Sequence, residues 1–177
     1  MDIKLQEILF LRYPKLFRRH EVPDAPIDER GIECGDGWFA LVERLASAGE
    51  AEIVALQAQG VPPSAWPRVA QIKEKFGSLR FYLDGNCSEQ FSQLIRETAD
   101  RLSVTVCEEC GMPGQLRNGR RYVRTTCDAC EAGQGSRSMD DFAAWERRQA
   151  EIRVLLDARV CFDGQGGPAE TREQNSI

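Results

Sequence analysis

Two pairs of cysteines have a spacing that suits metal binding. Cys107 and Cys110 are two residues apart, sixteen residues follow, and Cys127 and Cys130 repeat the spacing. Together they can supply four thiolates to one tetrahedral ion, which is the closed geometry of structural zinc. Because four cysteine ligands leave no position for water or substrate, we predict a structural Zn²⁺ in a zinc ribbon at 104–131. The alternative is two redox-active dithiols.

The segment between the two cysteine pairs is rich in arginine and contains a run without acids. On the arm of a ribbon these arginines would face solvent, and could contact an anion, a nucleic acid or a partner protein. Two residues of the body, Arg80 and Tyr82, are further candidates for partner contact, because Arg, Tyr and Trp are common interface anchors. The arginines of the arm are Arg117, Arg120, Arg121 and Arg124.

Few residues could support catalysis. The chain has one histidine, His20, in a polar segment, and it has no nucleophile elbow, Walker loop or dinucleotide motif. The remaining candidate is the turn at 35–37 with Glu33 and Cys34, where a helix N-terminus could lower the thiol pKa. A simpler interpretation is a turn that requires its glycines above a packed cysteine. We therefore predict that the protein is not an enzyme.

The composition is typical of a globular protein, with 42% hydrophobic and 29% charged residues in a chain of 177. No apolar run approaches the length of a membrane span, and the N-terminus lacks the features of a signal peptide. We therefore expect a cytoplasmic location, no membrane association, and seven reduced cysteines. The net charge of −5 weighs mildly against a generic nucleic-acid-binding surface.

The pattern of apolar and turn residues predicts an α+β fold with a small helical and β-hairpin body, a four-Cys ribbon and a C-terminal helix. In the body, at 1–103, we expect helices at 3–12, 38–46, 50–59 and 87–102. Asp36 should cap the second of these helices, and Asn86 with Glu89 should cap the last. We also expect a loop at 19–36 and a hairpin at 69–83 with a type II′ turn at Gly77-Ser78. Beyond it we expect ribbon strands at 115–117 and 122–126, a linker at 132–138, a helix at 139–158 capped by Ser138, and a disordered tail at 162–177.

Three motifs occur in order along the chain: residues 32–39 (IECGDGWF), 71–82 (QIKEKFGSLRFY) and the C-E-E-C-G-x-P opening of the ribbon. With these motifs the chain resembles a group of small proteins encoded in bacteria and their phages, mostly described as hypothetical. The resemblance covers about residues 5–130 and implies an accessory protein of phage or prophage type. It implies no activity.

The ribbon opening is also similar to the zinc finger of RNA-polymerase secondary-channel regulators. Those proteins present acidic residues at the tip of a coiled coil that precedes the finger, whereas a hairpin and one helix precede it here.

These observations lead to three functional hypotheses. The leading one is a protein-binding module that modulates or inhibits a partner protein, with Arg80, Tyr82, Trp66 and Trp145 as candidate anchors. The alternative is a nucleic-acid-binding or transcription regulator that uses the arginine-rich arm. The third is a redox sensor whose cysteine pairs release zinc on oxidation.

Overall fold

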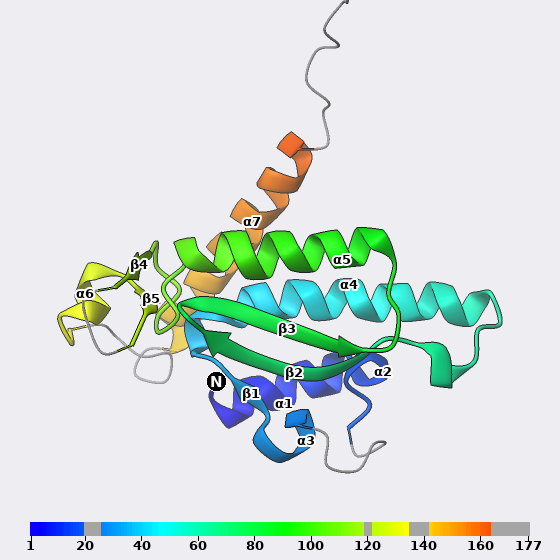
Figure 1. Ribbon diagram of the computed structural model, residues 1–177. Coiled ribbons are helices and arrows are strands. Elements are labelled where there is room, and N and C mark those ends of the chain that lie inside the picture. Colours follow the sequence, from blue (N-terminus) through cyan, green and yellow to red (C-terminus); the bar gives the residue numbers. More distant parts are fainter. Residues whose placement is uncertain (20–25, 119–121, 135–141, 164–177) are drawn as a thin grey trace, which may run out of the picture.

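The computed structural model describes residues 1–19, 26–118, 122–134 and 142–163, with side chains described as far as Val154. It contains helices and two small, largely antiparallel sheets, as predicted for an α+β fold (Figure 1). The helices are α1 (Ile3–Arg12), α2 (Pro14–Phe17), α3 (Pro26–Arg30), α4 (Phe39–Ala58), α5 (Glu89–Ile95), α6 (Asp128–Glu131) and α7 (Phe142–Asp163). The strands are β1 (Ile32–Glu33), β2 (Arg68–Lys75), β3 (Ser78–Asp84), β4 (Gln115–Arg117) and β5 (Arg124–Thr126). Three short 3₁₀ segments are η1 (Asp36–Trp38), η2 (Pro63–Ala65) and η4 (Ser103–Thr105), and η3 (Arg96–Leu102) is π-helical.

The body is built on a three-stranded sheet with the strand order β1–β2–β3. β1 runs parallel to β2, with Ile32 opposite Ile72, and β2 runs antiparallel to β3, with Ile72 opposite Phe81. In Figure 1 the β2–β3 hairpin crosses in front of α4, with α5 along one side and α1 along the other. The sheet and these helices share one buried core, which also includes Trp145 and Ile152 of α7.

α4 is one continuous helix of 20 residues, whereas the sequence predicted two helices at 38–46 and 50–59. Gly49, one of the three residues between the two predicted helices, is buried within α4. A Cβ on Gly49 would lie 2.8 Å from both Leu16 Cδ1 and Phe91 Cζ. Glycine at this position therefore allows α2 and α5 to pack closely on α4, and it does not interrupt the helix.

The β2–β3 hairpin spans nearly the range expected, but its turn differs from the prediction. Lys75 pairs with Ser78, and the two residues between them, Phe76 and Gly77, have φ values of 55° and 76°. Two consecutive positive φ angles belong to a type I′ turn, not to the predicted type II′ turn at Gly77-Ser78. The left-handed conformation of Phe76 costs about 1 kcal/mol, and its side chain is 70% exposed.

The helix predicted at 87–102 begins later and changes its winding. Ser88, not Asn86, caps α5, since the Ser88 hydroxyl accepts a hydrogen bond from Phe91 N at 3.1 Å. The second half of the run is the π-helical segment η3, a form often found beside functional sites. The predicted loop at 19–36 is likewise more ordered than expected, because it contains α3 and β1.

The N-terminal helix agrees with its prediction, whereas the C-terminal helix extends beyond the predicted end. α1 has the predicted bounds, and α7 continues to Asp163, so the first two residues of the predicted disordered tail are helical. The following predictions fall outside the described residues: His20, the first part of the helix at 139–158 with its cap at Ser138, residues 135–138 of the linker, and residues 164–177 of the tail.

Candidate metal centre

The four paired cysteines come together in space. The Sγ atoms of Cys107, Cys110, Cys127 and Cys130 all lie within 4.8 Å of one another, and Cys110 Sγ is 3.7 Å from Cys127 Sγ. A tetrahedral ion with metal–sulfur bonds of about 2.3 Å requires sulfur–sulfur separations of about 3.8 Å. The arrangement therefore fits one tetrahedral metal ion bound by four thiolates.

A backbone turn in each cysteine pair orients its two thiol groups toward the candidate metal position. In the first turn, Cys107 O accepts from Gly111 N at 2.9 Å and Cys107 N donates to Met112 O at 2.7 Å. Gly111 has a φ of 80°, which glycine adopts without strain, as the sequence predicted. In the second turn, Cys127 Sγ accepts from Cys130 N at 3.4 Å at the start of α6.

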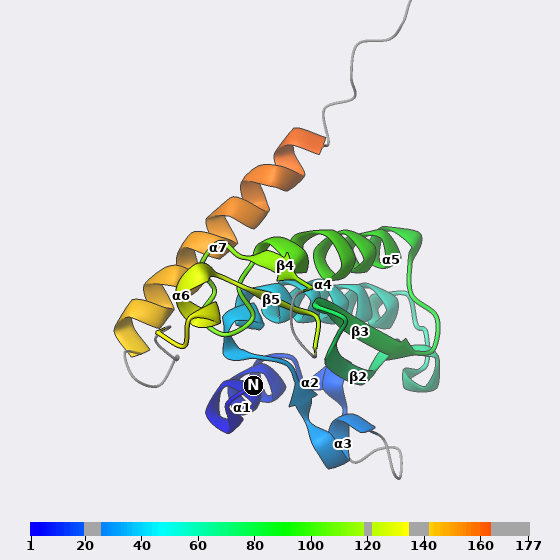
Figure 2. The same cartoon turned by 60° about the vertical axis from the view of Figure 1, so that its left-hand side comes forward.

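Two short strands connect the pairs. β4 has the bounds predicted for the first ribbon strand, and β5 is two residues shorter than the predicted strand at 122–126. They pair antiparallel, with Leu116 opposite Thr125. We call the described residues 106–118 and 122–131 the four-Cys module; Figures 1 and 2 show it at one end of the body, beside the beginning of α7.

The thiol groups influence one another's protonation. The hydrogen bond from Cys110 lowers the pKa of Cys107 to about 4, and the same bond raises the pKa of Cys110. Burial raises the pKa of Cys130 to about 12. A divalent ion held by these four sulfur atoms would favour the deprotonated form of all four thiols, because its charge offsets the repulsion of four thiolates.

Glu108, between the first two cysteines, holds the module against the body. Its side chain is 5% exposed, and its Oε1 accepts from Gly35 N at 3.0 Å. Its backbone oxygen accepts from Gly37 N at 2.8 Å, while its own N–H donates to Thr125 O at 2.9 Å. Burial raises the pKa of Glu108 to about 7. No sequence pattern singles out this residue.

The turn at 35–37 was the candidate catalytic site of the sequence analysis. In the structure it is the surface on which the first cysteine turn, Cys107–Gly111, docks; we call this turn the first knuckle. A Cβ on Gly35 would lie 2.8 Å from Glu108 Cγ, and a Cβ on Gly37 would lie 2.7 Å from Glu108 O and would collide with Cys107 O. Both glycines are therefore needed for close backbone approach. Cys34 is buried beneath the turn, and burial raises the pKa of its thiol, the opposite of what a nucleophile needs.

The tip of the β2–β3 hairpin contacts the other side of the module. Thr125 Oγ1 donates to Gly77 O at 2.6 Å, and a Cβ on Gly77 would collide with Leu116 Cδ1. The three sequence motifs, which lie far apart in the chain, therefore meet around the cysteine cluster.

α7 contacts both the first cysteine turn of the module and the turn at 35–37. Arg148 Nε donates to Cys110 O at 3.0 Å. Gln149, which is fully buried, accepts from Ala40 N at 2.9 Å and donates to Gly37 O at 3.5 Å. Gln149 thus satisfies one of the free N–H groups in the first turn of α4, a role that the sequence predicted for Asp36. Asp36 instead accepts a hydrogen bond from Asp2 N at 2.6 Å.

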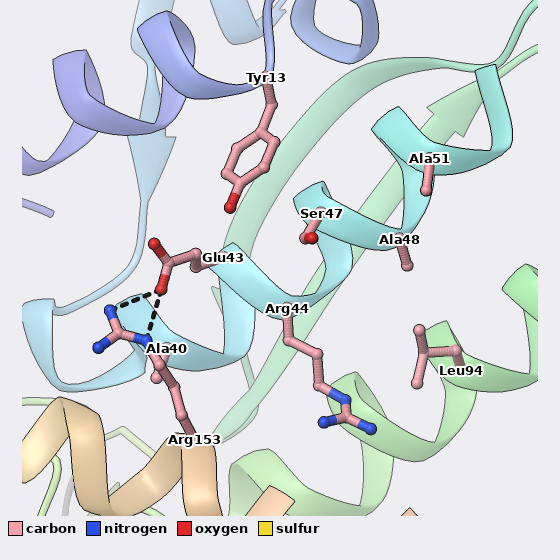
Figure 3. Close-up of a pocket in the computed structure, with 9 residues that line it drawn as sticks. All are labelled: Tyr13, Ala40, Glu43, Arg44, Ser47, Ala48, Ala51, Leu94 and Arg153. Atoms are coloured by element: carbon pink, nitrogen blue, oxygen red, sulfur yellow. Dashed lines mark hydrogen bonds and ion pairs between the residues drawn. The ribbon is translucent and has the colours of Figure 1, made fainter. Parts of the chain in front are cut away.

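A hollow of about 440 Å³ lies where α7 crosses the middle of α4 (Figure 3). Glu43 stands at its rim, 8% exposed, and is bonded to Arg153 Nε at 2.7 Å and to Arg12. Tyr13 points toward Glu43, and burial raises the pKa of its phenol, with the Glu43 charge as the second cause. These contacts tie α7 to α1 and α4.

The two arginines of the arm that the structure describes are each paired with an acid. Arg117 pairs with Asp128, and Arg124 pairs with Glu109, while Arg120 and Arg121 lie outside the described residues. The remaining candidates are on β3, away from the arm. Arg80 is 2.6 Å from Asp100 in an ion pair, and Tyr82 is 42% exposed.

Comparisons with family models, with curated proteins and with solved structures gave no match to this chain. Within the described part of the chain, no helix combines the length and apolar character needed to cross a lipid bilayer.

Proposed function

We propose that the four-Cys module is a zinc ribbon that holds one structural Zn²⁺, and that the protein is a non-enzymatic, cytoplasmic accessory protein of phage or prophage type that binds a partner protein and modulates or inhibits it. The observation that carries the structural role is the closed donor set. Four thiols converge within 4.8 Å, and four protein ligands complete a tetrahedral shell. Four-thiolate tetrahedra are characteristic of zinc and of iron, and of these zinc has no redox chemistry of its own.

The surroundings of the cluster support a structural role over a catalytic one. The adjacent turn at 35–37 is filled by Glu108, and the nearby Cys34 is buried as a thiol. Binding of a structural zinc ion typically contributes on the order of 10 kcal/mol to folding, and here the bound segment also contacts the core.

Exposed apolar side chains support a role in protein binding. Phe76 is 70% exposed and Leu116 is 43% exposed. Gly77, next to Phe76 in the chain, approaches Leu116 Cδ1 where the hairpin tip meets the module. Exposed apolar groups are common at protein interfaces. Among the described arginines of the arm, Arg117 and Arg124 are each paired with an acid, which favours the protein-binding role over the nucleic-acid alternative.

Two measurements test this proposal. Elemental analysis of the purified protein should give one zinc per chain, and none after the Cys127→Ser and Cys130→Ser changes are combined. A pull-down from the native host, with and without nuclease, should recover one protein at near-equal amounts from both lysates. Recovery that requires intact nucleic acid would favour the arginine-rich arm, and the absence of any stoichiometric partner would refute the protein-binding role.

A further inference from the structure

A groove of about 540 Å³ lies between the four-Cys module and α7, and we call it the knuckle groove. Its walls are the end of the η3–η4 run, the first knuckle with the loop that follows it, and one side of α7. Apart from Thr105, Arg148 and Glu151, the residues that line it are apolar or glycine. A mostly apolar cavity of about 300 to 1,000 Å³ with a few polar groups is typical of a small-ligand site.

Backbone hydrogen bonds hold the walls of the knuckle groove that belong to the module. Cys107 N donates to Met112 O at 2.7 Å, and Gly114 N donates to Thr105 O at 2.9 Å. Gly114 must be glycine, because a Cβ there would lie 2.7 Å from Cys107 N. These walls are therefore formed before a ligand arrives, and binding does not have to order them.

Apolar side chains from three elements face the knuckle groove. Leu102 and Ile152 line it and are largely buried, whereas Met112 lines it and is 46% exposed. Gly111 brings the first knuckle against α7, since a Cβ there would lie 3.1 Å from Ile152 Cδ1. An apolar group that enters the groove is removed from water on several sides, which favours binding.

Arg148 places a fixed positive charge at the knuckle groove. Its Nε donates to Cys110 O at 3.0 Å, which positions the guanidinium group. Its Nη2 is buried and has no hydrogen-bond partner among the described residues. A buried donor without an acceptor is costly, and more so when it is charged. Because Nε is already used, a carboxylate would be held through the Nη1 and Nη2 edge of the group.

Glu151 is the second charged residue that lines the knuckle groove. It follows Arg148 by three residues on α7 and is exposed, and it does not accept from the buried Nη2 of Arg148. The Glu151 charge is therefore compensated by water, whereas the buried part of the guanidinium group is not. The group that complements this site is an acid.

We propose that the knuckle groove binds a small carboxylic acid with an apolar body, of the class of medium-chain acyl carboxylates. The carboxylate pairs with Arg148 and supplies the acceptor for its Nη2. The apolar body is buried against Met112 and Ile152. This inference adds a ligand site to the protein and does not depend on the proposed partner.

Calorimetric titration of the metal-loaded, full-length protein with octanoate tests the site. The matched ligands are 1-octanol and octylamine, which have the same apolar body and a neutral or a positive head group. We expect octanoate to saturate one site and to bind about tenfold more tightly than 1-octanol, because only octanoate makes a charged hydrogen bond. Absence of saturable octanoate binding, or equal affinity for 1-octanol, would overturn the proposal. Tighter binding of octylamine would assign the head group to Glu151 and overturn it as well.

Two substitutions on α7 should change the octanoate affinity in opposite directions. Arg148→Gln replaces the charge by a neutral amide, so binding should be about tenfold weaker. Glu151→Gln removes an exposed acid beside the carboxylate, so binding should be about twofold tighter. A damaged fold explains no gain in affinity, and unchanged affinity in both variants would contradict the assignment.

The methionine methyl groups locate the ligand in the unaltered protein. With isotope-labelled methionine methyl groups, octanoate should shift the NMR signal of Met112 and leave that of Met1, which packs on the core elsewhere, unchanged. Octanoate that binds without a shift at Met112 would lie outside the knuckle groove. If short peptides with a free apolar C-terminus bind and octanoate does not, the groove receives a protein C-terminus and the small-ligand assignment is wrong.

Discussion

Replacement of Gly37 by alanine tests whether the four-Cys module is docked as described. Gly37 itself has no unusual backbone requirement, so the effect should come from contact with the module alone. The new Cβ would collide with Cys107 O and Gly111 N and would lie 2.7 Å from Glu108 O, where ordinary contacts begin at 3.4 Å, so the first cysteine turn must move by at least about 0.7 Å. That movement lengthens the hydrogen bond from Gly37 N to Glu108 O from 2.8 Å to about 3.5 Å or more, where it is effectively lost.

The expected loss of stability follows from these contacts. One neutral hydrogen bond contributes about 1 kcal/mol, and the neighbouring bond from Gly35 N to the Glu108 carboxylate about 2 kcal/mol. We therefore expect Gly37→Ala to lower the free energy of unfolding by about 3 kcal/mol, measured by urea denaturation of the metal-loaded protein. Zinc content should remain one per chain, because no ligand changes.

Gly133→Ala is the matched control, since it makes the same substitution just beyond the module in a place where no atom lies within 4 Å. At Gly133 the added methyl group meets no neighbour, and the only cost is the strain of alanine at a φ of 75°, about 1 kcal/mol. A Gly37→Ala protein that unfolds within about 0.5 kcal/mol of the unaltered one would refute the docking described here.

Three further outcomes are expected. Burial raises the pKa of Cys34, so above the ordinary thiol pKa the folded chain keeps a proton that the unfolded chain releases. The stabilisation that the buried thiol contributes is therefore complete below a pH of about 8.5 and decreases above it. The free energy of unfolding should fall as pH rises above about 8.5, and less steeply in Cys34→Ala. Arg117→Ala and Arg124→Ala should each change the free energy of unfolding by less than about 1 kcal/mol in urea denaturation, because both belong to surface ion pairs. Chelation of the metal should release α7, so that limited trypsin digestion cleaves after Arg148 rapidly, whereas unchanged protection would show that α7 docks independently of the metal.

Local patterns predicted the local elements well. The bounds of α1 and β4 follow from the spacing of apolar residues and turn residues, and the cysteine spacing predicted which four thiols converge. Predictions failed where a distant contact changes the meaning of a residue. Glycine has a low helix propensity, so Gly49 favours a helix end in the sequence. In the structure, the absence of a side chain at Gly49 allows Leu16 and Phe91 to pack against the backbone of α4.

The candidate site shows the same limit. The glycines at 35 and 37 are recognisable as a turn, but the sequence does not show that the backbone of Cys107 and Glu108 will occupy the space a side chain would need. Gln149 is a polar residue among the apolar residues on one side of α7. In the structure its amide joins the first turn of α4 to the docking turn, which no periodicity could indicate.

The position of the metal centre makes it part of the body and not an appended module. Cys110 O receives Arg148 of α7, and Gly111 lies so close to the same helix that a Cβ there would be 2.7 Å from Gln149 Nε2 and 3.1 Å from Ile152 Cδ1. The shape of the first cysteine turn, which a bound metal ion would fix, therefore sets the surface on which α7 packs. Since Trp145 and Ile152 of α7 also complete the core over α4, metal binding should stabilise the fold well beyond its four ligands.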